Sequence, residues 1–475
     1  MAINLQYAGE FEVSSLKIIS TKGVEADISK TVMEINVFEN LFSSSMSASI
    51  LLADTNDLAS KLPIIGQEFV KMKIQMPSLN KSGSNFISTQ IDLIFCLYKI
   101  GFRSEIRNGG QMMELHLVTP ETLKNHRTRI SQSYTDSIDN IVDSVLKDYI
   151  QTNRDRLVEK TIGIKKIVVP NMHPYDLIKM LAREAISDND LGTFIFFENK
   201  EGLHFKSLKN LYNSTVIESF EGGSFRMTPL GNGHPAAYYV EMEYKRALTY
   251  GISGQNDMLA NIKSGMLGSS MTTYDSFRKS YYTHTYAHSF KGDDEQLESH
   301  SIYSPSLIDK ENNQINEFPL SRIHLQSGDE NQINTFQGTT VEDTITDGRK
   351  LPETFLRRQA KFSELTTGTT MNISVNGNLT LSVGGIVEFN LPTTKAATGG
   401  KEVDPHHSGK YLITALRHNF IHPVSQGGGT HTIYLEAVRD SIPFKIPLPT
   451  DELEQPIKGS GFVTRVSGGD DYGGM

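Results

Sequence analysis

The two ends of this chain carry the same order of strand and turn features, and this repetition constrains the possible folds more than any other property. Residues 62–77 and 379–392 both read as an apolar residue, a turn glycine, a strand and a proline that ends the strand. The features that follow in both are a polar loop (78–85 and 393–408), a strand ending in basic residues (97–103 and 413–420), a glycine-rich turn (108–110 and 427–429) and a closing strand (112–118 and 430–438). This shared order favours a duplicated β unit, although any two small antiparallel barrels would share part of it.

Residues 1–120 and 351–440 are each predicted to form an antiparallel β-barrel. In the first segment Met113, Leu115 and Leu117 alternate with mostly polar residues, which gives the strand one apolar face. The stretches that predict strands are 11–20, 31–38, 46–52, 69–76, 86–102 and 112–118 in the first segment, and 371–375, 379–383, 386–390, 410–420 and 430–438 in the second. Residues 355–362 fit either a short helix or a strand.

Between the barrels, residues 121–245 are predicted to form an α+β module. One helical face is given by the spacing of Ile138, Ile141, Val142, Val145, Leu146 and Tyr149, with Thr135 or Asp136 as the cap. A second helix is expected to begin near Pro174 and to bury Leu177, Ile178, Leu181 and Ala185. Residues 193–198 and 203–205 predict a hairpin in which Gly202 takes a positive φ.

Two further segments lack a clear period. Residues 246–350 are rich in Ser, Gly, Asn, Asp, Thr and Tyr, and we expect an irregular interaction region with short elements that the sequence does not place. Residues 441–475 are dense in Pro and Gly, which predicts an extended C-terminal tail that orders against a partner.

Composition excludes several functional classes. The chain has 475 residues with 46 Lys plus Arg against 55 Asp plus Glu, a net charge of −9, whereas proteins that grip nucleic acid usually carry a basic excess. The single cysteine, Cys96, lies in an apolar run and is expected to be a small buried hydrophobe. The sequence shows neither a secretory signal pattern at its start nor an apolar run long enough to span a membrane, so we expect synthesis and assembly in the cytoplasm.

The sequence also resembles a known family. The residues that carry this resemblance are Phe38–Phe42, 47–54, 64–68, 357–362, 375–392, 408–413 and 436–441. Together they resemble the baseplate hub proteins of T-even-like contractile-tailed bacteriophages, whose tube domains are shared with type VI secretion spike proteins. The resemblance covers both ends and the helical module, but it does not cover residues 246–350.

The resemblance implies a structural role in the virion. It implies a homotrimer whose two barrels per chain form a pseudo-sixfold ring, joined to the tail tube or tube-initiator proteins above and to the trimeric cell-puncturing spike below. It further implies contact with baseplate wedge proteins and non-specific passage of DNA through the lumen during genome ejection. The alternatives are a spike-type component of a contractile secretion system, disfavoured because only 35 residues follow Asp440, and a tail-associated cell-wall hydrolase.

The sequence predicts that the chain is not an enzyme. We expect no catalytic, cofactor-binding or metal-binding residues and no cofactor. His284 and His288 have the spacing of metal ligands on a helix, but their aromatic and Thr neighbours favour a strand. The adjacent His406 and His407 would point apart on an extended chain. The acidic clusters 293–295 and 470–471 are expected to be solvated, and Gly66, Gly384 and Gly385 are expected to be turn residues. Four arginines fit interface or lumen charges and solvated strand edges equally well: Arg103, Arg107, Arg417 and Arg439.

Overall fold

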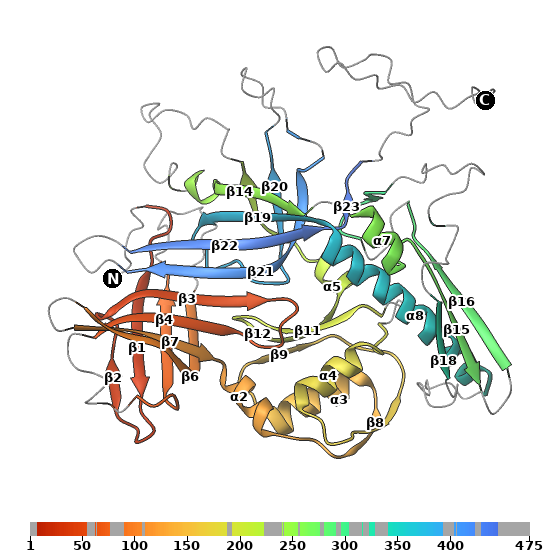
Figure 1. Ribbon diagram of the computed structural model, residues 1–475, viewed down its shortest axis with the longest axis horizontal. Coiled ribbons are helices and arrows are strands. Elements are labelled where there is room, and N and C mark those ends of the chain that lie inside the picture. Colours follow the sequence, from red (N-terminus) through yellow and green to blue (C-terminus); the bar gives the residue numbers. More distant parts are fainter. Residues whose placement is uncertain are drawn as a thin grey trace, which may run out of the picture.

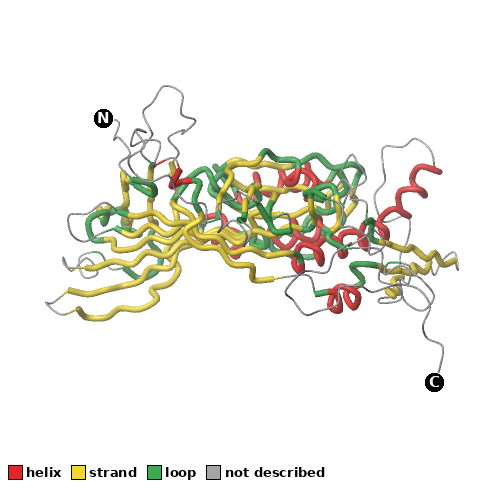
Figure 2. The backbone as a smooth tube through the Cα atoms, turned by 90° about the horizontal axis from the view of Figure 1, so that it is seen from above, coloured by secondary structure: helices red, strands yellow, loops and turns green. Residues whose placement is uncertain are grey.

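The computed structural model confirms a mainly β fold with an α+β insertion (Figure 1). The residues that it describes are 7–54, 62, 64–76, 90–106, 110–187, 192–222, 240, 242–254, 257–275, 280–290, 296–303, 316, 323–327, 341–392, 403–404, 406–422 and 429–444. Seen from above, long strands dominate one end and the middle of the molecule, and helices lie in the middle and at the other end (Figure 2).

The first β unit is an antiparallel sheet built from the N-terminal strands. Its members are β1 (Glu12–Ile19), β2 (Glu25–Asp27), β3 (Val32–Asn40), β4 (Ser47–Asp54), β5 (Phe69–Gln75), β6 (Gln90–Ile106) and β7 (Gly110–Val118). They pair in the order β3-β4-β7-β6-β5-β1-β2. Alternate residues such as Leu115 and Leu117 face a core that also holds Leu16, Ile50 and Phe95. The predicted strands of this segment are confirmed where they are described; residues 86–89 of the stretch 86–102 lie outside the described residues, and β2 was not predicted.

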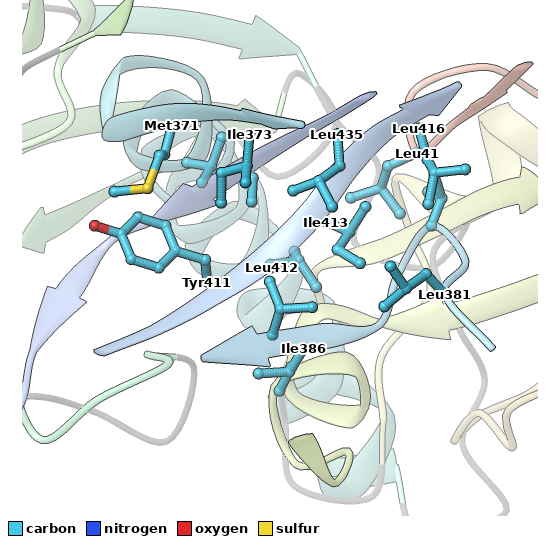
Figure 3. Packing of buried hydrophobic residues seen from close by; sticks show 14 of the residues in the cluster. Leu41, Met371, Ile373, Leu381, Ile386, Tyr411, Leu412, Ile413, Leu416 and Leu435 are labelled. Carbon is cyan, nitrogen blue, oxygen red and sulfur yellow. The ribbon is translucent and has the colours of Figure 1, made fainter. Parts of the chain in front are cut away.

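The second β unit draws its strands from a much wider stretch of sequence. Its members are β13 (Val216–Glu221), β14 (Ala247–Gly254), β19 (Thr369–Asn376), β20 (Ile386–Asn390), β21 (Gly409–Ile421) and β22 (Thr430–Arg439). They pair in the order β14-β19-β22-β21-β20-β13. Met371, Ile373, Leu412 and Leu435 pack in its core (Figure 3). Strand β13 lies in the range predicted as the α+β module, and β14 lies in the range predicted to be irregular.

The two units have the same strand order both in space and along the chain. Strands β1, β3, β4, β5, β6 and β7 correspond in turn to β13, β14, β19, β20, β21 and β22. The β6–β7 and β21–β22 pairs even share a bulge, between Leu97 and Lys99 in one and between Ile413 and Ala415 in the other. One difference is that β1 runs antiparallel to β5, whereas β13 runs parallel to β20. The predicted duplication is thus visible in the topology.

The two units are joined directly, because β21 pairs antiparallel with β3. This joint makes one 13-stranded sheet that runs through both units, with β3 beside β21 in Figure 1. The prediction of two separate barrels needs this correction: within the described residues the strand pairings continue from one unit into the next, and neither unit closes on itself. The stretch 379–383 was predicted as a strand, but it forms turns between β19 and β20.

The α+β module packs around its own core. Its elements are α2 (Pro120–Arg127), β8 (Ser133–Asp136), α3 (Ile138–Ser144), the π-helix η1 (Val145–Ile150), β9 (Asp155–Val158), β10 (Lys165–Val168), α4 (Pro174–Ala182), β11 (Phe194–Glu198), β12 (Gly202–Ser207) and α5 (Leu208–Tyr212). The apolar face predicted for residues 138–149 and that of α4 both enter this core, with Tyr149 only partly buried.

Two local predictions in this module were wrong. The residue that caps α3 is Ser137, because Asp136 ends β8 and accepts a hydrogen bond from the Ser137 N–H. Gly202 is also not among the glycines with positive φ. Its small size matters for another reason: a Cβ there would lie 2.2 Å from the Asp155 carbonyl oxygen on the neighbouring strand β9. The predicted hairpin itself is confirmed as β11 and β12.

The range 246–350 holds regular elements besides β14. These are α7 (Met258–Ser264), β15 (Gly268–Asp275), β16 (Ser280–Ala287), β17 (His300–Ser301), β18 (Ile323–Ser327) and the start of α8 (Val341–Thr367). Strands β16, β15 and β18 form a separate sheet beside α8 (Figure 1). Helix α8 settles the alternatives for residues 355–362. Of the predicted tail, residues 441–444 are described and include β23 (Ser441–Ile442), which pairs with β17; the rest lies outside the described residues.

Candidate assembly surface

The joint between the two β units carries a polar network on the outer face of the sheet. Asn419 on β21 donates its side-chain N–H to Asn36 on β3 over 2.8 Å, and these two residues are directly opposed. The Arg417 Nε also donates to Asn36, over 2.9 Å, and another guanidinium nitrogen donates to Glu34 over 3.2 Å. Because successive side chains of a strand point to opposite faces, these polar side chains lie on the other face of the sheet from the core-facing Ile35, Val37 and Phe420. The network therefore fixes the register of β3 on β21.

A groove follows this joint. It has a volume of about 430 Å³ and is lined in part by Phe38, Asn372, Arg417, Tyr434 and Glu436, which come from β3, β19, β21 and β22. The Arg417 guanidinium lies 5.8 Å from the centre of the Phe38 ring and 5.5 Å from that of Tyr434. Both rings are exposed, Phe38 by 37% and Tyr434 by 48%. An exposed arginine between two rings is typical of interaction surfaces.

The rest of this outer face is polar and mixed in charge. Alternation places Ser49, Glu114 and His116 on it from β4 and β7, on one side of the β3–β21 joint, and Asn372, Ser374 and Glu436 from β19 and β22, on the other side. Carboxylates of Glu34, Glu114 and Glu436 stand among the cations of Arg417 and Lys99. On these strands the described side chains of the face therefore mix acidic and basic groups. On β1 and β5 of the same sheet Lys17 directly opposes Lys71, with Lys73 two residues further along, and Glu25 and Asp92 lie 2.9 Å from Lys17 and 3.7 Å from Lys73.

A buried charged junction ties the three parts of the molecule together. Glu39 on β3, only 2% exposed, accepts hydrogen bonds from the backbone N–H of Lys200 over 2.9 Å and of Val383 over 3.0 Å. The Lys200 ammonium, from the β11–β12 loop, donates to the carbonyl oxygens of Leu379 and Leu381. Burial raises the pKa of Glu39 and lowers that of Lys200, while their mutual attraction acts in the opposite direction on each.

A second junction joins the α+β module to the first β unit. The Glu198 carboxylate is fully buried, accepts from the backbone N–H of Met46 over 2.9 Å and from the Thr119 hydroxyl over 3.0 Å, and pairs with Arg154. Burial raises the pKa of Glu198 to about 7. Neither junction could be predicted, because each joins residues that are remote in sequence; Glu39 does lie in the Phe38–Phe42 stretch that carries the family resemblance.

The members of each histidine pair considered for metal binding have different contacts. His284 lies on strand β16, as the neighbouring aromatic residues favour, while His288 is buried with its Nε2 2.8 Å from the Ser301 hydroxyl. The His407 Nδ1 lies 2.7 Å from the Asp404 carboxylate, which also accepts from the His406 backbone N–H over 2.8 Å, whereas the His406 ring packs edge-on against Phe444. Within the described ranges, no group of three or more His, Cys, Asp or Glu is placed to hold a metal ion.

The arginines predicted as interface or lumen charges separate into different roles. Arg417 lies on the outer face, and Arg103 is exposed on β6. Arg439 is instead buried, at 2% exposure, and donates to the Ser408 carbonyl over 2.8 Å, so both of its predicted roles were wrong. Arg107 and the acidic clusters 293–295 and 470–471 lie outside the described residues.

The remaining predicted residues behave as packing and turn residues. Cys96 is buried, and burial raises the pKa of its thiol to about 11, as expected of a small hydrophobe. Gly66 and Gly384 have φ of 91° and 84°, which suits turn glycines, whereas Gly385 is not among the positive-φ glycines. Among the described helices, none is long and apolar enough to cross a membrane.

No family model and no curated protein matches this chain. Among solved structures, a tail protein from Neisseria meningitidis is 10% identical with a TM-score of 0.49, over 91% of this chain and 98% of that one. The 43 kDa tail protein of prophage MuSo2 from Shewanella oneidensis is 11% identical with a TM-score of 0.47, over 90% and 98%. A type VI secretion component from E. coli is 10% identical with a TM-score of 0.37, over 88% and 78%.

Further similar structures include a baseplate of phage P2 and a Francisella complex that contains VgrG. These five solved structures contain tail and baseplate proteins, a type VI secretion component and VgrG. We draw the functional proposal from this chain's own strand order and surfaces.

Proposed function

We propose that this chain is a structural hub of a contractile phage tail baseplate and that it works as a homotrimer. The observation that carries the proposal is the pair of β units with one strand order, joined through β3 and β21 into a continuous sheet. Three copies would supply six like units around one axis, so that a threefold assembly offers near-sixfold symmetry to its neighbours.

The outer face of the continuous sheet is the surface that we assign to the channel. Its Ser, Asn and Thr side chains are small, and its carboxylates stand among the basic residues Arg417 and Lys99. Over β3, β4, β7, β19, β21 and β22 a wall of this kind would not hold passing phosphates tightly, because tight binding to DNA requires clustered Lys and Arg. On β1 and β5 the carboxylates of Glu25 and Asp92 lie against Lys17 and Lys73 and offset their charge. In this proposal DNA passes without specific contact.

The partners follow from the position of such a ring in the virion tail. The tail tube or its initiator proteins would stack above, the trimeric spike would bind below, and wedge proteins would surround the hub. The residues beyond 444 are proposed to contact the spike or the adjoining subunit. The proposal assigns no catalytic residue and no cofactor to the chain.

The test is the mass of the full chain in solution, measured alone and after mixing with a candidate spike protein. We expect a species of three chains in at least the mixture, because the permanent interfaces of such assemblies are large. A monomer under both conditions would contradict the hub proposal. Turnover of peptidoglycan by the purified chain would favour a hydrolase instead.

A further inference from the structure

The corresponding edges of the two β units differ in their strand pairing. In the first unit the edge strand β3 is covered, because β21 pairs with it. Its counterpart in the second unit is β14, whose one strand partner among the described residues is β19. An unpaired edge presents a row of free N–H and C=O groups and is a template for another strand.

The exposure of core-facing side chains agrees with β14 having no second strand beside it among the described residues. Val118 on β7 and Val438 on β22 occupy the same position in the two units. Following the cross-strand partners from these two residues, Ile35 and Val37 of β3 correspond to Tyr250 and Ile252 of β14. Ile35 is 1% exposed and Val37 is fully buried, whereas Tyr250 is 41% exposed and Ile252 is only partly buried. Core-facing side chains of β14 are thus left open where a second strand would cover them.

Strand β6 offers the complementary edge. Its counterpart β21 uses residues 409–412 to pair with β20 and residues 415–421 to pair with β3. In β6, residues 90–96 pair with β5 in the same way, but in the described chain residues 99–106 have β7 as their one strand partner. Phe102, in this open segment, is 42% exposed.

We propose that β14 of one copy pairs antiparallel with residues 102–106 of β6 in the next copy, which repeats the β3–β21 joint between subunits. The proposal rests on the hub function, since it gives the ring its subunit joint. The register follows from that of the β3–β21 joint, in which Asn419 opposes Asn36. The corresponding residues are Ser104 on β6 and Gly251 on β14, so these two should oppose each other between copies. The pairing is head-to-tail and closes when three copies meet.

Opposed residues on antiparallel strands have Cα atoms about 4.5–5.5 Å apart, which lies within the range that a disulfide spans. The double variant Ser104→Cys with Gly251→Cys should therefore form disulfides between copies. A Cβ at Gly251 meets nothing within 4 Å, and Ser104 is exposed, so both changes fit the folded chain. The native Cys96 is buried and adds no competing thiol at the surface.

The experiment oxidises the full-length double variant and separates the products on a denaturing, non-reducing gel. We expect covalent dimers and trimers, trimers being the largest species, and their loss on reduction. The two single variants and the pair Ser104→Cys with Val168→Cys serve as controls and should stay uncrosslinked. Val168 is 77% exposed but lies on β10 in the α+β module, away from both edges.

The outcomes separate this inference from the function on which it rests. A native trimer without covalent species would overturn the strand pairing and leave the hub function standing, whereas a protein that remains monomeric with and without spike protein would overturn both. A second variant, Gly251→Trp, places a bulky side chain at the joint of an otherwise intact fold. We expect its trimer to dissociate at protein concentrations where the wild-type trimer persists; an equally stable trimer would contradict the pairing.

Discussion

Removing the Glu39 carboxylate should destabilise the chain severely, because this group connects all three parts of the molecule. In Glu39→Ala the N–H groups of Lys200 and Val383 lose their acceptor, and the partly buried Lys200 ammonium loses its opposite charge. Each orphaned buried N–H costs about 1–3 kcal/mol, and breaking a buried charge pair costs about 3–5 kcal/mol. Since these terms overlap, we expect a total loss of about 3–5 kcal/mol.

Urea unfolding followed by circular dichroism measures this loss as a shift of the midpoint. Glu39→Gln separates charge from hydrogen bonding: it keeps one acceptor oxygen and should recover part of the lost stability. The control is Glu25→Ala, which removes an exposed carboxylate 2.9 Å from Lys17 and should leave the midpoint unchanged. If Glu39→Ala moved the midpoint no more than Glu25→Ala does, the junction would not hold the units together.

Three further predictions concern packing and titration. Gly384→Ala should lower stability by about 1–3 kcal/mol in urea unfolding, because φ is 84° and the new Cβ would lie 2.9 Å from the Phe197 ring, whereas Gly251→Ala, with open space, should cost less. Burial lowers the pKa of His431 from 6.5 to about 3, so the unfolded chain binds a proton there that the folded chain excludes. Stability should therefore fall as the pH drops from 6.5 toward 3. His431→Phe should weaken that fall, measured as the difference between the urea midpoints at pH 7 and 4.5. The Cys96 thiol should react with a disulfide reagent only after urea unfolds the chain, since burial raises its pKa to about 11, and prompt reaction of the native protein would contradict its burial.

Local patterns predicted most of the strands but not the membership of the second unit. Alternation along 112–118 and 430–438 predicted β7 and β22 within about a residue or two. Strand β13 pairs with β20, which lies more than a hundred residues further along the chain, and β14 pairs with β19 across a similar gap. Such pairings depend on tertiary contacts that no short window of sequence contains.

The wrong predictions have similar physical causes. Residues 379–383 alternate like a strand, but Leu379, Leu381 and Val383 are buried in turns, with Leu379 and Leu381 carbonyls held by Lys200. Gly202 looked like a turn glycine, yet β9 approaches it so closely that only a residue without Cβ fits. Arg439 ends an alternating strand, but backbone carbonyls satisfy its charge inside the fold. In each case a remote partner decides the role of the residue.

Electron cryomicroscopy of the full-length chain, alone and mixed with spike protein, tests the central claim most directly. We predict end views with threefold symmetry, six similar lobes and a hollow centre, lined by the strands that carry Asn36, Asn372 and Arg417. Particles without a central channel, or rings in which the lobes formed by the two β units do not alternate around the axis, would contradict the account.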